Sequence, residues 1–235
     1  MKIAIINPNS TAGMTEKCRL VAEQVKNSGT EIMAINPKDT PASIEGHYDE
    51  AISLGPLLRE MKAAEAAGAN GFVLACFDDP GLHACREVVA GPVIGICEAA
   101  MHAASMLATS FSVVTTLNRS VPIIEDLARQ YGLHHYCRRV RAADIPVLDL
   151  EAEGKKGDEA RAKVRQEIMN AVKEDNCEAI ILGCAGMADL ARDLSRDCGL
   201  PVINGVVVAV KLCEALVGAG LSTSKINAYA PPRRK

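Results

Sequence analysis

Residues 71–80 read GFVLACFDDP, and a similar stretch, AIILGCAG, returns at residues 179–186. In each stretch an apolar run ends on a small residue, and a cysteine follows it, Cys76 in the first and Cys184 in the second. The two cysteines lie 108 positions apart (184 − 76). If the two stretches are equivalent parts of a repeat, the two cysteines end equivalent strands.

The same spacing recurs elsewhere in the chain. Residues 3–7 (IAIIN) fall on residues 111–115 (FSVVT) at 108 positions, and residues 92–94 (PVI) fall on 201–203 (PVI) at 109. The period is much longer than the roughly 20 to 50 residues of a solenoid repeat. It therefore predicts two half-chains of similar plan.

Each half alternates short apolar runs with helical patterns, which is typical of α/β proteins with parallel sheets. We expect strands at residues 2–6, 31–36, 72–76, 91–96, 111–114, 137–143, 179–184 and 201–204. We expect helices after residue 10, at 49–68, from 80, at 97–109, from about 119, at 158–175, up to 198 and at 206–218.

These patterns predict an α/β fold of two pseudo-symmetric, doubly wound lobes with parallel sheets and an active site in the cleft between them. The predicted first lobe contains residues 1–96 and 206–235, and the second contains residues 97–205. The last predicted helix crosses back onto the first lobe.

The composition excludes several classes of protein. The chain has 235 residues, 49% of them hydrophobic, and its net charge is −3, so we expect no nucleic-acid partner. No apolar run approaches the roughly 20 residues of a membrane span, and the N-terminus lacks a signal-peptide pattern. We predict a cytoplasmic protein without a membrane partner. Its nine cysteines, none in CxxC spacing, are expected to be free thiols without a bound metal.

Candidate ligand-binding residues follow the ends of predicted strands, where open parallel sheets bind their ligands. The candidates are Asn9 after the first strand, Ser43 and Ile44 in a long loop, Phe77 beside the first cysteine, Thr115 and Thr116 after the fifth strand, and Gly183 and Ala185 around the second cysteine. Small residues such as Gly183 let a ligand approach the backbone closely.

The segment from Cys76 to Asp79 is predicted to form a turn between a strand and a helix that begins near Pro80. A thiol there lies near backbone N–H groups and a positive helix end, so we expect its pKa to be lowered. Asp78 and Asp79 are predicted to cap the first turn of that helix.

Two cysteines that face one cleft have three chemical interpretations. They could form a redox disulfide, share a soft metal, or exchange a proton with one carbon atom from opposite faces. The first usually uses CxxC spacing, and the second needs further ligands, so the third explains the arrangement better. Inverting a carbon centre beside a carbonyl requires one base and one acid on opposite faces, and a thiolate and a thiol can supply them.

Five motifs resemble the hydantoin racemases of the aspartate/glutamate racemase superfamily. They are INPN at 6–9, PASIEGHYDE at 41–50, ACFDDPGL at 75–82, FSVVTTL at 111–117 and LGCAGM at 182–187. The resemblance extends over essentially the whole chain. It implies a cofactor-independent racemase that acts on a small hydantoin-ring substrate through a catalytic pair, Cys76 and Cys184. It also implies that residues 43–45 and 115–116 bind the ring.

The preferred hypothesis is racemisation of 5-monosubstituted hydantoins, which the apolar Phe77 favours. Allantoin racemisation is the alternative, since allantoin racemases look similar and allantoin differs only in its 5-substituent. A non-catalytic small-ligand binding protein and a redox sensor with a Cys76–Cys184 disulfide are alternatives of other classes. The apolar helices favour self-association into a homo-oligomer.

Overall fold

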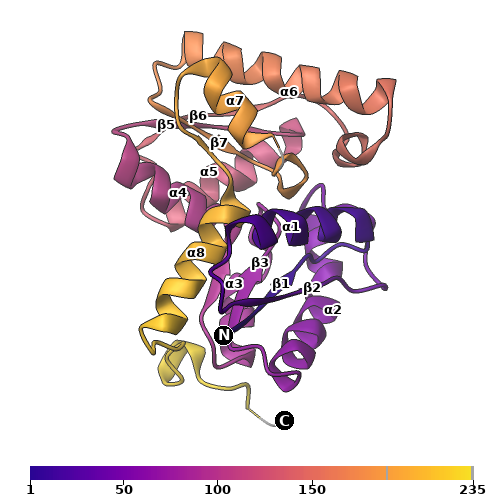
Figure 1. The fold of residues 1–235 in the computed structure, drawn as a ribbon, viewed down its shortest axis with the longest axis vertical. Helices are drawn as coiled ribbons and strands as arrows, with labels where there is room; N and C mark the ends of the chain where they lie inside the picture. The colour runs from indigo at the N-terminus through magenta and orange to yellow at the C-terminus, as the bar shows by residue number, and fades with distance from the viewer. Residues whose placement is uncertain (189, 234–235) are drawn as a thin grey trace.

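A computed structural model describes residues 1–188 and 190–233, in which two four-stranded sheets are entirely parallel. The first sheet has the order β2-β1-β3-β4 and the second the order β6-β5-β7-β8. The strands of the first sheet are β1 (Lys2–Ile6), β2 (Glu31–Ile35), β3 (Gly71–Leu74) and β4 (Val93–Gly95). Those of the second are β5 (Phe111–Thr115), β6 (Cys137–Ala142), β7 (Ala179–Leu182) and β8 (Val202–Ile203). The two sheets, each with its helices, form two lobes (Figure 1).

The register of the two sheets confirms the repeat seen in the sequence. Ile3 pairs with Gly71 in the first sheet, and Phe111 pairs with Ala179 in the second. Both members of the second pair lie 108 positions after their counterparts in the first. The two cysteine-bearing strands, β3 and β7, are therefore structurally equivalent.

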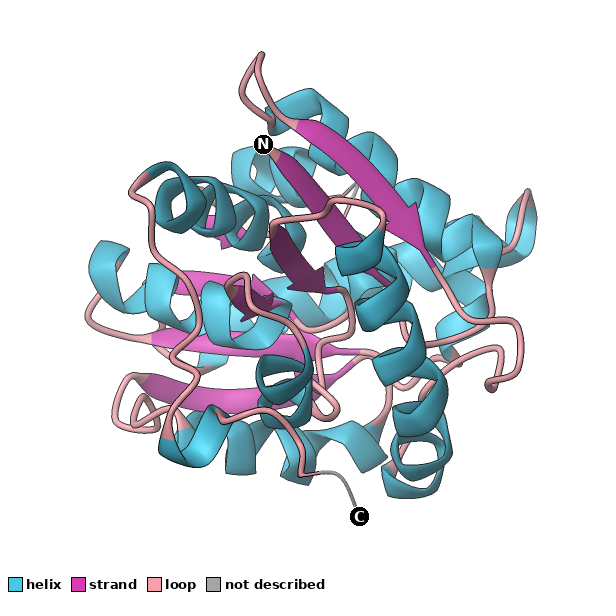
Figure 2. Ribbon diagram, turned by 90° about the horizontal axis from the view of Figure 1, so that it is seen from below, coloured by secondary structure: helices cyan, strands magenta, loops and turns pink. Residues whose placement is uncertain are grey.

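Helices connect the strands and cover both faces of each sheet (Figure 2). They are α1 (Ala12–Val25), α2 (His47–Ala66), α3 (Leu82–Val88), α4 (Ile96–Leu107), α5 (Val121–Gln130), α6 (Lys155–Glu174), α7 (Ala191–Cys198) and α8 (Gly205–Gly218). Two short 3-10 helices, η2 (Val147–Glu151) and η3 (Ala185–Met187), border the site described below.

Alternating side chains along the strands explain the double winding. In β1, Ile3 and Ile5 belong to the same buried cluster as residues of α1 and α8, whereas Ala4 and Ile6 pack with Leu57 of α2. Successive residues of a strand point to opposite faces, so a strand that is apolar throughout must be covered on both sides. The predicted fold class is confirmed.

One buried cluster joins the two lobes. It contains β1 and β5 residues together with residues of α1, α4, α5 and α8. Helix α8 packs against α4, α1 and β3. No helix in the described ranges has the combination of length and hydropathy that crossing a membrane requires.

One helix begins later than the sequence predicts. Helix α3 starts at Leu82, not near Pro80, because the backbone at Asp79 (φ 42°) and Gly81 (φ 65°) is left-handed. A right-handed helix cannot include these two residues. The turn that carries Cys76 is therefore longer than predicted, and α3 lies further from the thiol.

Candidate functional site

A cavity that is partly open to solvent lies at the carboxyl ends of β1, β3, β5 and β7. Residues of both lobes line it: Asn9, Met14, Ile44, Ala75, Cys76, Phe77, Asp78, Thr115, Thr116, Ser120, Val147, Gly183, Cys184, Ala185 and Gly186.

The site residues that the sequence analysis named line this cavity, with the exception of Ser43 and Glu45. The Ser43 hydroxyl instead donates to Glu45 Oε1 (3.0 Å). The same carboxylate oxygen accepts a hydrogen bond from the Val147 N–H (3.3 Å), so Glu45 links the long loop of the first lobe to η2 of the second. Ser43 thus supports the wall that Ile44 and Val147 form.

The loop after β1 is held by amide side chains. Asn9 Oδ1 accepts hydrogen bonds from Asn7 Nδ2 (2.9 Å) and from the Thr11 N–H (3.0 Å). Thr11 precedes α1 but its hydroxyl does not cap the helix; it donates to the Ala42 carbonyl (2.6 Å). This hydroxyl therefore connects two loops near the cavity.

The ends of β5 and β7 approach each other closely beside Cys184. The Thr115 hydroxyl donates to the Gly183 carbonyl (2.9 Å). A β-carbon at position 183 would lie 2.9 Å from Thr115 Cβ and 3.0 Å from the Val114 carbonyl oxygen. Glycine at 183 is therefore required by the packing of the protein itself.

Lys17 lies beside the cavity and contacts its wall, and the sequence analysis missed it. It lies on α1 of the first lobe, and its Nζ donates to Glu151 Oε1 (2.8 Å) and to the Gly186 carbonyl (3.2 Å), both in the second lobe. Gly186 is two residues after Cys184. Nothing in the sequence marks this lysine, because its partners come from segments more than 130 residues away.

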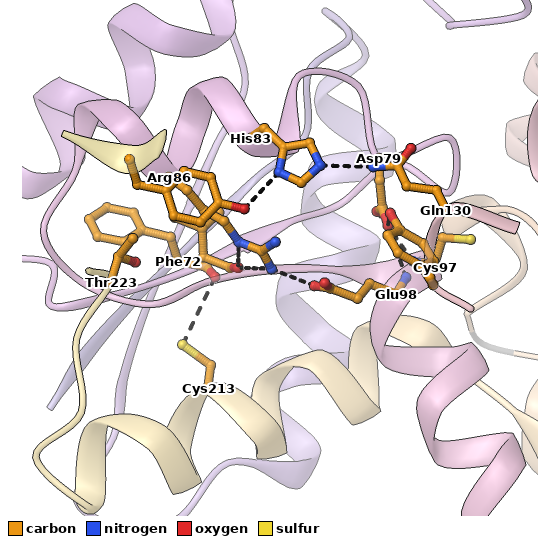
Figure 3. A network of polar contacts seen from close by, with 12 residues as sticks. Phe72, Asp79, His83, Arg86, Cys97, Glu98, Gln130, Cys213 and Thr223 are labelled. Atoms are coloured by element: carbon orange, nitrogen blue, oxygen red, sulfur yellow. Dashed lines mark hydrogen bonds and ion pairs between the residues drawn. The ribbon is translucent and has the colours of Figure 1, made fainter. Parts of the chain in front are cut away.

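Asp79 caps a different helix from the one predicted. Its Oδ2 accepts hydrogen bonds from the Glu98 N–H (2.9 Å) and the Tyr131 hydroxyl (2.7 Å), and its Oδ1 accepts one from the Cys97 N–H (3.3 Å). These two N–H groups belong to the first turn of α4, not α3 (Figure 3). Burial raises the pKa of Asp79 to about 7, although the three hydrogen bonds oppose this shift.

Asp78 does not cap α3 either, because its side chain lines the cavity. Burial raises its pKa to about 7, and the neighbouring carboxyls of Glu50 and Asp79 add to the shift. The carboxyl group nearest Cys76 in sequence is therefore able to change its charge near neutral pH.

The expected lowering of the cysteine pKa is wrong. Burial raises the pKa of Cys76 well above its usual value, and the negative charge of Asp78 raises it further. Burial also raises the pKa of Cys184, to about 11, while the Gly186 N–H and Lys17 oppose the shift. A helix end would have had the opposite effect, but α3 begins six residues after Cys76.

The remaining cysteines are also free thiols. Within residues 1–188 and 190–233, no group of three or more His, Cys, Asp or Glu side chains is arranged to hold a metal ion. The cavity therefore presents two half-buried thiols, one carboxyl group and several hydroxyl and amide groups to a ligand.

Residues 3–213 match the Asp/Glu/Hydantoin racemase family, and the chain belongs to that family. It is a racemase, an enzyme of the isomerase class. The hydantoin racemase of Rhizobium meliloti is 54% identical to it over the whole chain and 96% of that relative. The hydantoin racemase of Pseudomonas sp. (strain NS671) is 47% identical over the whole chain and 93% of that relative.

A solved structure is equally similar. The allantoin racemase from Klebsiella pneumoniae superposes with a TM-score of 0.97 at 48% identity, covering all of this chain and 95% of that one. The chain is thus similar to racemases named for two substrates that share a hydantoin ring.

Proposed function

We propose that the protein racemises 5-monosubstituted hydantoins by proton transfer at C5 between two cysteines, Cys76 and Cys184. The observation that carries this proposal is that both thiols line one cavity from the ends of equivalent strands, β3 and β7. A ligand bound between the two strand ends has one thiol available on each face.

The C5–H bond of a hydantoin lies beside a carbonyl group, so removing its proton gives a planar enolate. One cysteine, as thiolate, takes the proton from one face of the ring, and the other, as thiol, delivers a proton to the opposite face. The product is the mirror image, and the two cysteines have exchanged protonation states. Backbone N–H groups and hydroxyls around the cavity stabilise the enolate oxygen, and no cofactor is required.

The raised pKa values of the thiols have two opposing effects on this chemistry. A thiolate whose conjugate acid has a pKa of about 11 is a stronger base than an ordinary cysteine, and the C5 proton is weakly acidic. Only a small fraction of the enzyme molecules carry this thiolate at neutral pH, but in those molecules the thiolate removes the C5 proton faster than an ordinary cysteine thiolate would.

The other cavity residues are proposed to bind the substrate. Asn9, Thr115, Thr116 and the backbone around Gly183 and Ala185 contact the polar ring. Ile44 and Phe77, both buried, form the apolar wall for the 5-substituent. Ser43 does not contact the substrate, and its hydroxyl instead holds the Glu45 carboxylate that supports the cavity wall.

Allantoin is the second candidate substrate. The observation that favours it is the Asp78 carboxyl group, which lines the cavity and can accept hydrogen bonds from the N–H groups of a ureido substituent. Sequence similarity does not decide the matter, because hydantoin and allantoin racemases are about equally identical to this chain.

Circular dichroism of one enantiomer of 5-benzylhydantoin in deuterated buffer tests the proposal, with (S)-allantoin in parallel. We expect the signal to decay as deuterium enters C5, and Cys76→Ser and Cys184→Ser each to abolish the decay. The faster substrate identifies the preferred 5-substituent. A stable signal with both substrates would leave a non-catalytic binding protein as the better description. Decay that survives either substitution would exclude the two-thiol mechanism.

We further propose that the two lobes consist of residues 1–96 with 206–235 and of residues 97–205, because each set contains one complete sheet. We also propose a cytoplasmic protein, in keeping with its free thiols. A homo-oligomer is supported by Met106 and Leu107 at the end of α4, which are 78% and 65% exposed. Light scattering that gives the mass of a single chain at micromolar concentration would exclude the oligomer.

A further inference from the structure

The turn that carries Cys76 has an unusual link to the rest of the molecule. Asp79 lies three residues after Cys76, and its N–H donates to the Cys76 carbonyl (3.1 Å), which closes the turn. Its backbone is left-handed (φ 42°), an uncommon conformation for a residue with a side chain. This conformation directs the buried carboxyl group toward the first turn of α4, whereas the adjacent Asp78 faces the cavity.

The Asp79 carboxyl group joins three parts of the fold. Its donors are two backbone N–H groups of α4 and the hydroxyl of Tyr131, which immediately follows α5 in the second lobe. Gly95 leaves the space for it, since a β-carbon there would lie 2.4 Å from Asp79 Cγ. The turn of Cys76 is thus tied directly to the lobe that carries Cys184.

The second lobe has a matching link of different chemistry. Asn204 lies at the start of α8, and its Oδ1 accepts hydrogen bonds from the Val206 and Val207 N–H groups (2.9 and 3.3 Å). Its Nδ2 donates to the Ala188 carbonyl (2.6 Å), four residues after Cys184. Each cysteine turn is therefore attached to the first turn of a helix, α4 or α8, and these two helices pack against each other.

We propose that Asp79 is a positioning residue that holds Cys76 in the correct place relative to Cys184. It does so through α4 and Tyr131, without touching the substrate itself. This inference depends on the proposed two-thiol racemisation, because it concerns the relative position of the two thiols. Asn204 has the corresponding role for Cys184.

Displacement of one thiol changes the C5 deuterium isotope effects of the two enantiomers in opposite directions. A general loss of protein stability does not. One enantiomer loses its C5 proton to Cys76, and the other loses it to Cys184. If Cys76 is displaced, every proton transfer that involves Cys76 becomes slow. The isotope effect of C5 deuteration then rises for the enantiomer deprotonated by Cys76. It falls toward one for the other enantiomer, whose slow step is protonation by Cys76.

The test measures kcat/KM for both enantiomers of 5-benzylhydantoin, with protium or deuterium at C5. The proteins are the wild type, Asp79→Asn, Tyr131→Phe and the control Glu98→Gln. Asp79→Asn replaces one acceptor oxygen by a donor group, and Tyr131→Phe removes one hydroxyl and is the milder change. Glu98 lies in the same network, but its side chain pairs with Arg86 (2.6 Å) and not with Asp79 (Figure 3).

We expect kcat/KM to fall about 10- to 100-fold in Asp79→Asn, as for a displacement near 1 Å, and less in Tyr131→Phe. In both variants the isotope effects of the two enantiomers should diverge in opposite directions, and in Glu98→Gln they should match the wild type. Lower activity with unchanged isotope effects in folded Asp79→Asn and Tyr131→Phe would overturn the proposal.

A second readout does not require activity. Iodoacetamide alkylation followed by peptide mass spectrometry should show a changed rate at Cys76 and an unchanged rate at Cys184 in both variants. Equal rates at Cys76 in the wild type and the variants would contradict the positioning role. An inactive wild type with altered Cys76 alkylation in the variants would reject the racemase proposal and leave the link between Asp79 and Cys76 standing.

Discussion

Lys17 and Glu151 form an ion pair, 2.8 Å from Nζ to Oε1, that joins the two lobes beside Cys184. The same ammonium group reaches the carbonyl of Gly186. The position equivalent to Gly186 in the first lobe, 108 residues earlier, is Asp78. The charge of Asp78 raises the pKa of both thiols, but at Cys184 the nearby Lys17 cation and the Gly186 N–H oppose the shift. The two thiols therefore lie in different electrostatic surroundings, although their strands are equivalent.

This asymmetry predicts that Cys184 loses its proton at a lower pH than Cys76. The pH dependence of iodoacetamide alkylation, resolved for each cysteine by mass spectrometry, measures both midpoints. Lys17→Met should raise the midpoint of Cys184 because it removes the favourable charge, and Cys76 should change less. Lys26→Met, at the residue that follows the same helix and pairs with Glu23, is the control. Equal midpoints in the wild type would contradict the prediction.

Asp78→Asn should stabilise the protein above neutral pH. Burial raises the pKa of Asp78 in the folded state to about 7, above its value in the unfolded chain, so the folded protein binds the proton more tightly. The stability that this proton contributes is complete below about pH 4 and is lost as the pH rises to about 7. Asparagine has no charge to bury, and we expect the free energy of unfolding at pH 8 to rise by roughly 1 to 3 kcal/mol.

Urea unfolding of Asp78→Asn and wild type at pH 4 and pH 8 measures this effect, with the exposed Asp126→Asn as control. The gain should be present at pH 8 and absent at pH 4. The variant should also lower the alkylation midpoint of Cys76, whose pKa the Asp78 charge raises. A loss of stability at pH 8 would show that Asp78 is ionised without cost in the folded protein.

Gly183→Ala should impair both folding and activity. The new β-carbon would meet the Thr115 backbone and the Val114 carbonyl at about 3.0 Å. Strand ends cannot move aside without displacing Cys184, so we expect a loss of about 1 to 3 kcal/mol, typical of overpacking. Gly29→Ala is the matched control, since nothing lies within 4 Å of its added β-carbon. Thermal unfolding that is equal for the two variants would argue against the close approach of β5 and β7.

Arg141→Met should destabilise the second lobe through an unpaired carboxylate. Arg141 Nε donates to Asp175 Oδ2 (2.7 Å), and the two side chains are 6% and 4% exposed. Burial acts to raise the pKa of Asp175, but hydrogen bonds from Arg141 and Ser112 hold it below its usual value. Leaving such a carboxylate without its partner costs about 3 kcal/mol.

The exposed pair of Arg129 and Asp126 provides the comparison. The Arg129 side chain is 59% exposed, so Arg129→Met should change the free energy of unfolding by less than about 1 kcal/mol. The difference in the free energy of unfolding between Arg141→Met and Arg129→Met should shrink as the pH falls below about 4, because Asp175 then takes up a proton. Denaturant unfolding at pH 7 and pH 3 measures both effects, and equal losses at pH 7 would contradict the prediction.

Local pattern and internal repetition predicted most of the fold. The spacing of 108 residues reappears as identical pairing register between β1 and β3 and between β5 and β7, because these strands have similar apolar runs and the same order in the two halves. The lining residues at the strand ends were also predictable, since parallel strands all end at the same edge of a sheet, but Met14, Ser120 and Val147 were not, because they come from helices or from a later loop. Ser43 and Glu45 were expected to bind the ring but do not line the cavity, and the Ser43 hydroxyl donates to Glu45 Oε1 instead.

The sequence alone determined two parallel α/β lobes and the placement of Cys76 and Cys184 at equivalent strand ends. Tertiary structure decided how each thiol is held and charged. Asp79 caps α4 because β3 and β4 pair in parallel and end side by side, and Lys17 reaches Gly186 because α1 packs against η3 of the other lobe. The raised pKa values of both cysteines likewise arise from burial by distant segments. A local sequence pattern does not predict this loss of solvation, because it depends on the whole fold.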